Sequence, residues 1–157
     1  MSLEQWVANA WLKRIRPSPE DIAGLLAIAD RELSDGALQG ISIDGRFTHA
    51  YDAVRALAEA ALHASKCDVP KGPGQHERAI ASLRFTLPPD MAGEVDYFDR
   101  CRRLRHRTVY ERMGLLQRSD ADELLQAAKD LRENVRGWLQ RQHPELVGGV
   151  AGERPSS

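Results

Sequence analysis

Arginine is concentrated between Tyr97 and Gly114, in a chain whose formal net charge is only −1. The arginines of this stretch are Arg100, Arg102, Arg103, Arg105, Arg107 and Arg112. If the stretch is helical, its 100° step per residue places Arg105 among apolar neighbours, between Cys101 and Val109. The residues expected on this apolar side are Tyr97, Phe98, Cys101, Leu104, Thr108, Val109 and Leu116. Burying an unpaired charge costs several kcal/mol. Arg105 must therefore meet a carboxylate, a partner chain or an anion, or reach the edge of the core by snorkelling.

His106 and Tyr110 lie one helical turn apart beside Arg105. An arginine fork neutralises phosphate, imidazole transfers protons near neutral pH, and a phenol can hydrogen-bond or stack on a base. This combination suits a phosphodiester. The alternative for Arg100, Arg103 and Arg107 is a solvated helix face, with Asp99 and Glu111 pairing locally.

The remaining motifs predict no cofactor and no metal site. The chain has no GxxxxGK, GxGxxG, HExxH or GxSxG pattern. His49, His63, His76 and His143 fall on different expected elements without a partner histidine at helical spacing, which disfavours a metal centre. The Gly72–Gly74 segment is interpreted as a turn. Trp6, Trp11 and Trp138 are expected to be core or interface anchors.

Composition indicates one soluble globular domain. Hydrophobic residues make up 42% of the 157 positions and charged residues 29%. Because the global charge is near zero, any site for a polyanion must be a local patch. Two cysteines are too few for a disulfide framework, and the chain shows neither a signal peptide nor a stretch of transmembrane length. We therefore expect a cytoplasmic protein with no membrane association.

Apolar periodicity predicts helices along most of the chain. A short helix precedes Pro17, and a second begins after Ser18 and stops near Gly36. The other expected helices are one opening near Asp44, one from His76 that Pro88 and Pro89 end, the arginine-rich one at 93–113, and a last one from Ser119 to before Pro144. The residues expected to face inward on the helix that opens near Asp44 are Ala50, Ala53, Val54, Leu57, Ala58, Ala61 and Leu62.

These elements predict an all-α fold, because no β alternation is convincing. Short loops between amphipathic helices favour an up-and-down helical bundle of about four core helices, with a smaller N-terminal helix laid across it. We expect one domain over residues 1–145 and a disordered tail over 146–157.

Two stretches resemble the HEPN domain superfamily. RRLRHRTVYERMG, preceded by DYFDR and followed by DADELLQAAKDLRENVRGWL, is similar to a bacterial branch that reads roughly RRKRNxxxYE. The upstream DGRFTHAYDAVRALAEAALHA resembles the first long core helix of that branch. The resemblance covers most of the chain between Ile43 and Trp138.

The resemblance implies a small helical bundle, commonly a homodimer, with members that are metal-independent ribonucleases or toxin components of toxin-antitoxin systems. Active members of the superfamily have an arginine, an adjacent polar residue and a histidine a few positions further on. By resemblance, these positions correspond to Arg105, His106 and Tyr110, so a tyrosine stands where the histidine is usual. Tyrosine, with an ordinary pKa of about 10, is a poor general base at neutral pH. Either His106 takes over proton transfer, or Tyr110 only positions substrate, or this branch binds RNA without cleaving it.

Two functions follow as expectations. The first is a homodimeric protein that binds RNA or a nucleotide, with Arg102, Arg103 and Arg107 contacting phosphates and endoribonuclease activity through Arg105, His106 and Tyr110. The alternative is a non-catalytic interaction module, which the resemblance pairs with a partner such as a small nucleotidyltransferase.

Overall fold

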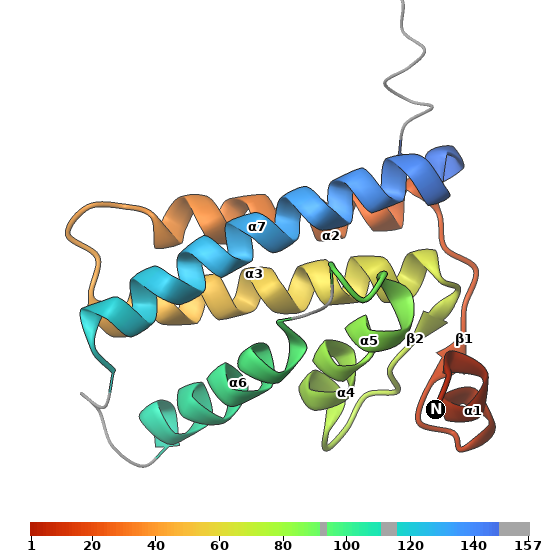
Figure 1. Ribbon diagram of the computed structural model, residues 1–157, viewed down its shortest axis with the longest axis horizontal. Coiled ribbons are helices and arrows are strands. Elements are labelled where there is room, and N and C mark those ends of the chain that lie inside the picture. The colour runs from red at the N-terminus through yellow and green to blue at the C-terminus, as the bar shows by residue number, and fades with distance from the viewer. Residues whose placement is uncertain (92–93, 111–115, 148–157) are drawn as a thin grey trace, which may run out of the picture.

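The computed structural model describes residues 1–91, 94–110 and 116–147, with the side chains of residues 107–110 excepted. Its helices and strands are α1 (Leu3–Ala8), β1 (Lys13–Arg14), α2 (Pro19–Gly36), α3 (Ile43–Ala64), β2 (Cys67–Asp68), α4 (Gln75–Ala81), α5 (Leu83–Thr86), α6 (Val95–Tyr110), α7 (Arg118–Gln142) and the 3-10 turn η1 (Pro144–Leu146). The predicted all-α helical bundle is confirmed. Consecutive long helices α2, α3, α6 and α7 run in opposite directions (Figure 1).

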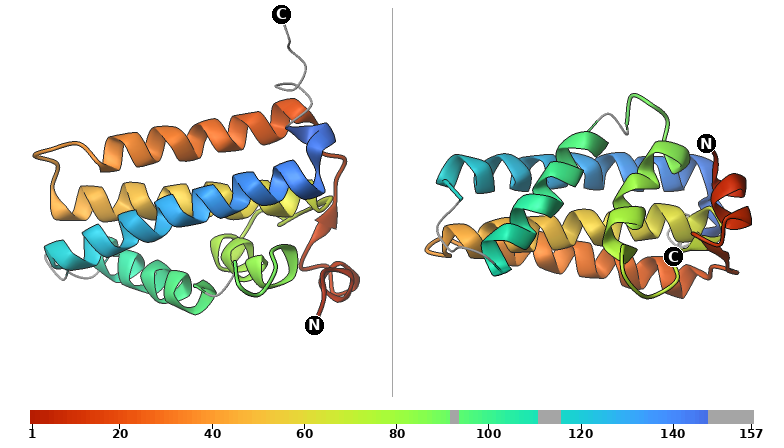
Figure 2. Two further views of the ribbon diagram at one scale, coloured as in Figure 1. Left: turned by 45° about the horizontal axis from the view of Figure 1, so that its top comes forward. Right: turned by 90° about the horizontal axis from the view of Figure 1, so that it is seen from below.

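Helix α3 is the centre of the bundle. Helices α2 and α7 pack along it on one side, and α4 and α6 cover it from below (Figures 1 and 2). Alanines allow this close approach, because small side chains let helix backbones come together. The residues predicted to face inward are all buried, and they are Ala50, Ala53, Val54, Leu57, Ala58, Ala61 and Leu62.

Serine caps begin two of the long helices. The Ser18 hydroxyl accepts a hydrogen bond from the backbone N–H of Asp21 at 3.1 Å, and Pro19 opens α2. At α3 the Ser42 hydroxyl accepts from the Gly45 N–H at 2.9 Å. Each cap satisfies an N–H that has no partner inside the helix. The start predicted at Ser18 is confirmed.

Two other helix boundaries differ from the prediction. The single helix expected from His76 up to Pro88 is broken into α4 and α5 at Ser82, whose buried hydroxyl donates to the Ala79 carbonyl at 2.6 Å. Helix α7 starts earlier than Ser119, because Gln117 and Asp120 form a reciprocal capping box. Both differences come from side chains that bond locally to the backbone, which apolar spacing does not reveal.

A short sheet was not expected. Strands β1 and β2 pair antiparallel, with Lys13 opposite Asp68 and Arg14 opposite Cys67. Strands of two residues are too short for an alternating pattern, so the sequence gives no signal for them. The pairing ties the chain after α1 to the end of α3, and a small separate core forms there around Leu12, Leu62, Cys67, Val69 and Ala79.

Two residues of the expected tail, Leu146 and Val147, lie within the described part of the chain. After α7 the chain forms η1, and Leu146 packs into the core. The rest of the expected tail, residues 148–157, lies outside the described residues. In the part of the chain that the structure describes, no helix combines the length and apolarity needed to cross a membrane.

His63 links three elements at one end of the bundle. Its Nδ1 lies 2.7 Å from Asp21 Oδ2, and its Nε2 lies 3.0 Å from Asp68 Oδ1. Burial acts to lower the pKa of His63, but the hydrogen bonds and charges of the two carboxylates outweigh it, so the pKa is raised. In its protonated form the imidazole on α3 bridges a carboxylate of α2 and a carboxylate of β2.

Replacing His63 with glutamine is expected to lower the free energy of unfolding in a pH-dependent way. A raised folded-state pKa gives stabilisation that is fully present below the unfolded pKa of about 6.5 and is lost as pH rises through the folded pKa. Urea unfolding of both proteins should show a difference of about 1–2 kcal/mol at pH 6 that shrinks toward pH 9. A difference that is constant across this range would contradict the role of the charged imidazole.

Candidate anion-binding site between α4 and α6

Helix α6 packs against α3 through its apolar side. Phe98 and Cys101 are buried, and Tyr97 and Leu104 are partly buried against the same core, as predicted. Leu116 is also buried, but it follows the helix rather than belonging to it. The side chains of Thr108, Val109 and Tyr110, which the prediction places on or beside this side, lie outside the described set. The described apolar residues fix which way Arg105 points.

Arg105 points toward α3 of its own chain. Its guanidinium carbon lies 5.2 Å from the centroid of the Tyr51 ring, a cation–π distance. The residue is half-buried, and its Nε is buried without a hydrogen-bond partner among the described residues. The position of Arg105 within the bundle therefore requires no second copy of the chain.

The Tyr51 side chain below Arg105 is 1% exposed, and its hydroxyl is a second buried polar atom without a partner in the described structure. Burial raises the pKa of Tyr51 to about 12, against the opposing effect of the nearby Arg105 and Arg55 charges. Buried polar groups normally have hydrogen-bond partners, and each unsatisfied group costs free energy. Arg105 Nε and the Tyr51 hydroxyl are thus two unsatisfied polar atoms that lie close together beneath the surface of the described structure.

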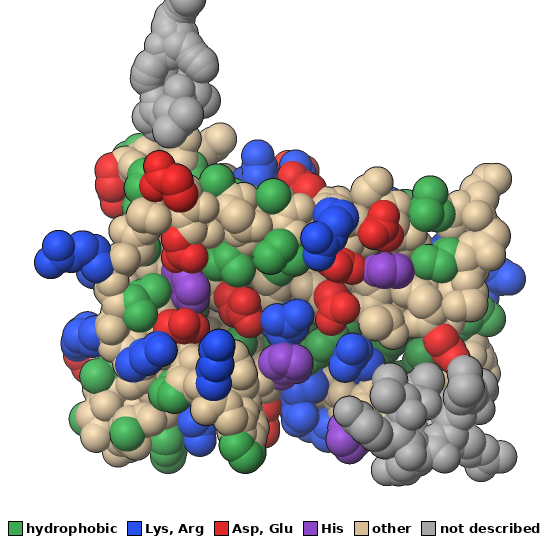
Figure 3. Space-filling view, turned by 180° about the vertical axis from the view of Figure 1, so that it is seen from behind, with side chains coloured by type: hydrophobic (Ala, Val, Ile, Leu, Met, Phe, Trp, Pro, Cys, Tyr) green, Lys and Arg blue, Asp and Glu red, His purple; other side chains and the backbone are tan. Residues whose placement is uncertain are grey.

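A cavity of about 250 Å³ opens at this place, between α4 and α6. We call it the cationic pocket. Its lining residues are Tyr51, Gly72, Gly74, Gln75, His76, Glu77, Arg102, Arg105 and His106. Figure 3 views the molecule from behind and shows Lys or Arg side chains and His side chains gathered below the middle of this face.

Positive charge dominates the cationic pocket. Arg102 and Arg105 both line it, and Glu77 is the one carboxylate among its lining residues. Arg102 Nε donates to Asp99 Oδ1 at 3.0 Å, and Asp99 also pairs with Arg103, so one carboxylate is shared between two guanidinium groups. Positive charge is thus left over for an anion.

His76 adds an imidazole to the same pocket. Burial lowers the pKa of His76, and repulsion by the Arg55 and Arg105 charges lowers it further. The ring is therefore neutral at pH 7 and can accept a proton or a hydrogen bond. In the sequence His76 is an isolated histidine, because nothing in the sequence shows that α4 packs against α6.

The structure brings together three of the predicted site residues. Arg102, Arg105 and His106 all line the cationic pocket. Arg103, predicted to contact RNA, is exposed and lines a different cavity. The side chains of Arg107 and Tyr110 lie outside the described residues, so their predicted roles stay predictions.

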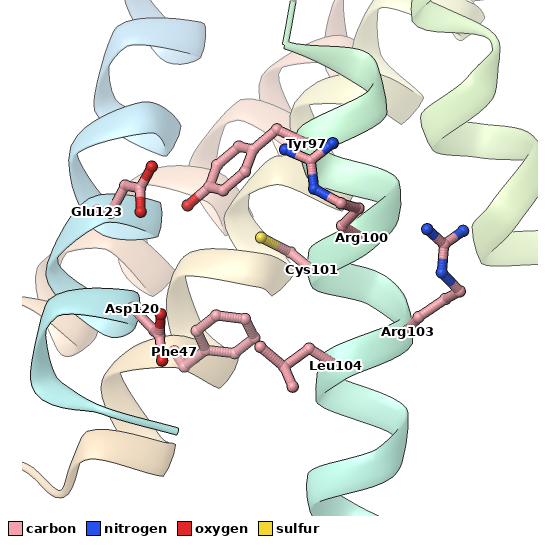
Figure 4. A pocket seen from close by; sticks show the side chains of 8 residues that line it. All are labelled: Phe47, Tyr97, Arg100, Cys101, Arg103, Leu104, Asp120 and Glu123. Carbon is pink, nitrogen blue, oxygen red and sulfur yellow. The ribbon is translucent and has the colours of Figure 1, made fainter. Parts of the chain in front are cut away.

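That other cavity, of about 510 Å³, lies between α6 and α7 (Figure 4). Its residues are Phe47, Tyr97, Arg100, Cys101, Arg103, Leu104, Asp120 and Glu123. Figure 4 shows the two carboxylates on α7 facing the cavity while Arg103 points away from them. Burial raises the pKa of Cys101 to about 11, which keeps its thiol protonated and unreactive. Because Asp120 and Glu123 offset the charges of its two arginines, the larger cavity lacks the excess positive charge that an anion needs.

Within the described residues, no group of three or more His, Cys, Asp or Glu side chains is arranged to hold a metal ion. Comparison of the chain with protein-family models, with curated proteins and with solved structures finds no match. Among the described residues, fold and site define a helical bundle that carries a cationic pocket against its central helix.

Proposed function

We propose that the protein binds RNA or a nucleotide through a phosphate group in the cationic pocket. The observation that carries the proposal is that Arg105 and Arg102 both line this pocket, where Glu77 is the one carboxylate among the lining residues. A guanidinium binds phosphate through two parallel N–H groups, so an arginine that lines the pocket can hold a phosphate there. The resemblance to HEPN domains also favours RNA.

The size of the pocket favours one phosphate group rather than a whole nucleotide. Sites that enclose drug-sized ligands have volumes of about 300–1,000 Å³, whereas this one has about 250 Å³. The rest of a bound RNA strand would therefore lie across the surface around the pocket.

Replacing Arg105 with alanine is expected to weaken binding of single-stranded RNA about tenfold, because one buried charge-assisted contact to phosphate is lost. Fluorescence anisotropy with a labelled twelve-nucleotide RNA measures the dissociation constant at several salt concentrations. The slope of log affinity against log salt should become shallower by about 0.7, the value for one phosphate contact on a single strand.

Arg100→Ala is the matched control. Arg100 lies on the same helix, is exposed and lines the cavity between α6 and α7, so its loss changes the net charge equally without touching the pocket. Arg105→Lys keeps the charge and should recover part of the affinity. If Arg100→Ala weakens binding as much as Arg105→Ala, the arginines act as an unspecific basic face. If the protein binds no RNA but co-purifies with another protein, the non-catalytic interaction module is favoured instead.

A second candidate function, metal-independent RNA cleavage, is favoured by two imidazoles in the arginine-lined pocket. In this reaction the ribose 2′-oxygen attacks phosphorus, its proton passes to His76, and the bond from phosphorus to O5′ breaks. His106 returns a proton to O5′, and the products are a 2′,3′-cyclic phosphate and a 5′-hydroxyl. Arg105 stabilises the charge that develops on the phosphate oxygens.

A further inference from the structure

Helix α4 has a neighbour on each side of the lower surface of the bundle. In Figure 2, right, α6 lies on one side of α4 and α1 lies on the other. The cationic pocket lies on the α6 side, and a cavity of about 370 Å³ lies on the α1 side. We call it the tryptophan pocket, and its lining residues are Trp6, Trp11, Gly74, Glu77, Arg78 and Ala81.

The two pockets share a wall. Gly74 and Glu77, at the start of α4, line both of them. Gly74 has a φ of +81°, and a Cβ added to it would meet nothing within 4 Å, so the backbone here is open to a ligand. A bound RNA strand that leaves the cationic pocket across Gly74 would therefore enter the tryptophan pocket directly.

Planar groups surround the tryptophan pocket. The Trp11 ring lies edge-to-face against Trp6, with centroids 5.9 Å apart, and Trp6 packs in turn on Phe85 at 5.1 Å. The Arg78 guanidinium lies 5.9 Å from the centroid of the Trp11 ring. Trp11 is nevertheless 37% exposed, while most large apolar side chains of the described chain are covered. Tryptophan and arginine planes held in position at a surface are the groups on which unpaired bases stack.

We propose that the tryptophan pocket holds a base of a single-stranded RNA whose neighbouring phosphate occupies the cationic pocket. This inference rests on the proposed function and assigns the substrate class of that same site. Stacking on an aromatic surface does not depend on which base is bound, so binding should tolerate many RNA sequences.

Glu77 favours a ribose between the phosphate and the base. Its carboxylate belongs to the wall shared by the two pockets, where a bare phosphate would be repelled. A carboxylate accepts hydrogen bonds from ribose hydroxyls, and the 2′-hydroxyl distinguishes RNA from DNA. The order of groups across α4 is therefore arginines, carboxylate and tryptophan, which matches phosphate, ribose and base.

The test compares two labelled probes by fluorescence anisotropy: hexaadenylate RNA and an abasic oligomer with the same number of phosphates. Trp11→Ala is expected to weaken binding of hexaadenylate at least fivefold, the lower end of the effect of losing one stacked base, and to change binding of the abasic oligomer less than twofold. Trp11→Phe should restore most of the affinity, which also shows that the fold is retained. Ile28→Ala removes an equally exposed apolar side chain from α2 and serves as the control.

The outcomes separate this inference from the proposed function. Arg105→Ala should weaken both probes, because it removes a phosphate contact. If Trp11→Ala changes both probes equally, or neither, the base site is overturned while phosphate binding stands. If the wild-type protein binds neither probe, the proposed function fails and the base site fails with it.

Discussion

His76→Ala is expected to slow RNA cleavage in the presence of EDTA by about 10²–10⁴-fold, the usual contribution of a general base. His76 lines the cationic pocket beside Arg105, and its lowered pKa leaves it neutral and able to take the proton of the 2′-hydroxyl at pH 7. Gel analysis of a defined RNA measures the rate, and the products should carry 2′,3′-cyclic phosphate ends.

The pH dependence gives a second measurement of the same step. Because the pKa of His76 is lowered below about 6.5, its basic form persists into mildly acidic solution. The rate should therefore stay high from pH 7 down to about 6.5 and fall only at lower pH, as the imidazole becomes protonated.

His143→Ala is the matched control for this experiment. His143 follows α7 and packs against the Trp138 ring at 4.9 Å, outside the lining of the cationic pocket. The His143→Ala variant should therefore leave the cleavage rate unchanged. His106→Ala should reduce the rate, because His106 lines the cationic pocket. If RNA is bound but the wild-type protein and His76→Ala show equal background cleavage, the protein is a binding module and not a nuclease.

Leu57→Ala is expected to lower the free energy of unfolding by about 2–5 kcal/mol. Leu57 is fully buried on α3, the helix against which α2, α6 and α7 pack, so the lost side chain leaves a cavity that its neighbours cannot fill. For a chain of this size the melting temperature should fall by about 5–15 °C. Urea unfolding followed by circular dichroism measures the change.

The same substitution at a surface leucine provides the control. Leu38, between α2 and α3, is 59% exposed, so Leu38→Ala should change stability by less than about 0.5 kcal/mol. Equal losses in the two variants would mean that α3 is not the centre of the core.

The sequence by itself determined the all-α class and the buried side of the long helix α3. Apolar residues at helical spacing placed the inward residues of α3, and Ser18 with Pro19 marked the start of α2, because caps and periodicity act between residues close in the chain. The same spacing identified Arg105 as a cation among apolar neighbours on α6.

Only the tertiary structure decided what those elements meet. Arg105 lies over Tyr51 of α3, and His76 of α4 joins the same pocket, although these residues are far apart in the chain. The pairing of β1 with β2 and the packing of Trp11 near α4 likewise gave no signal in the sequence. The physical reason is that local patterns report which side of a helix is apolar, whereas the partner of that side depends on how all the helices pack together.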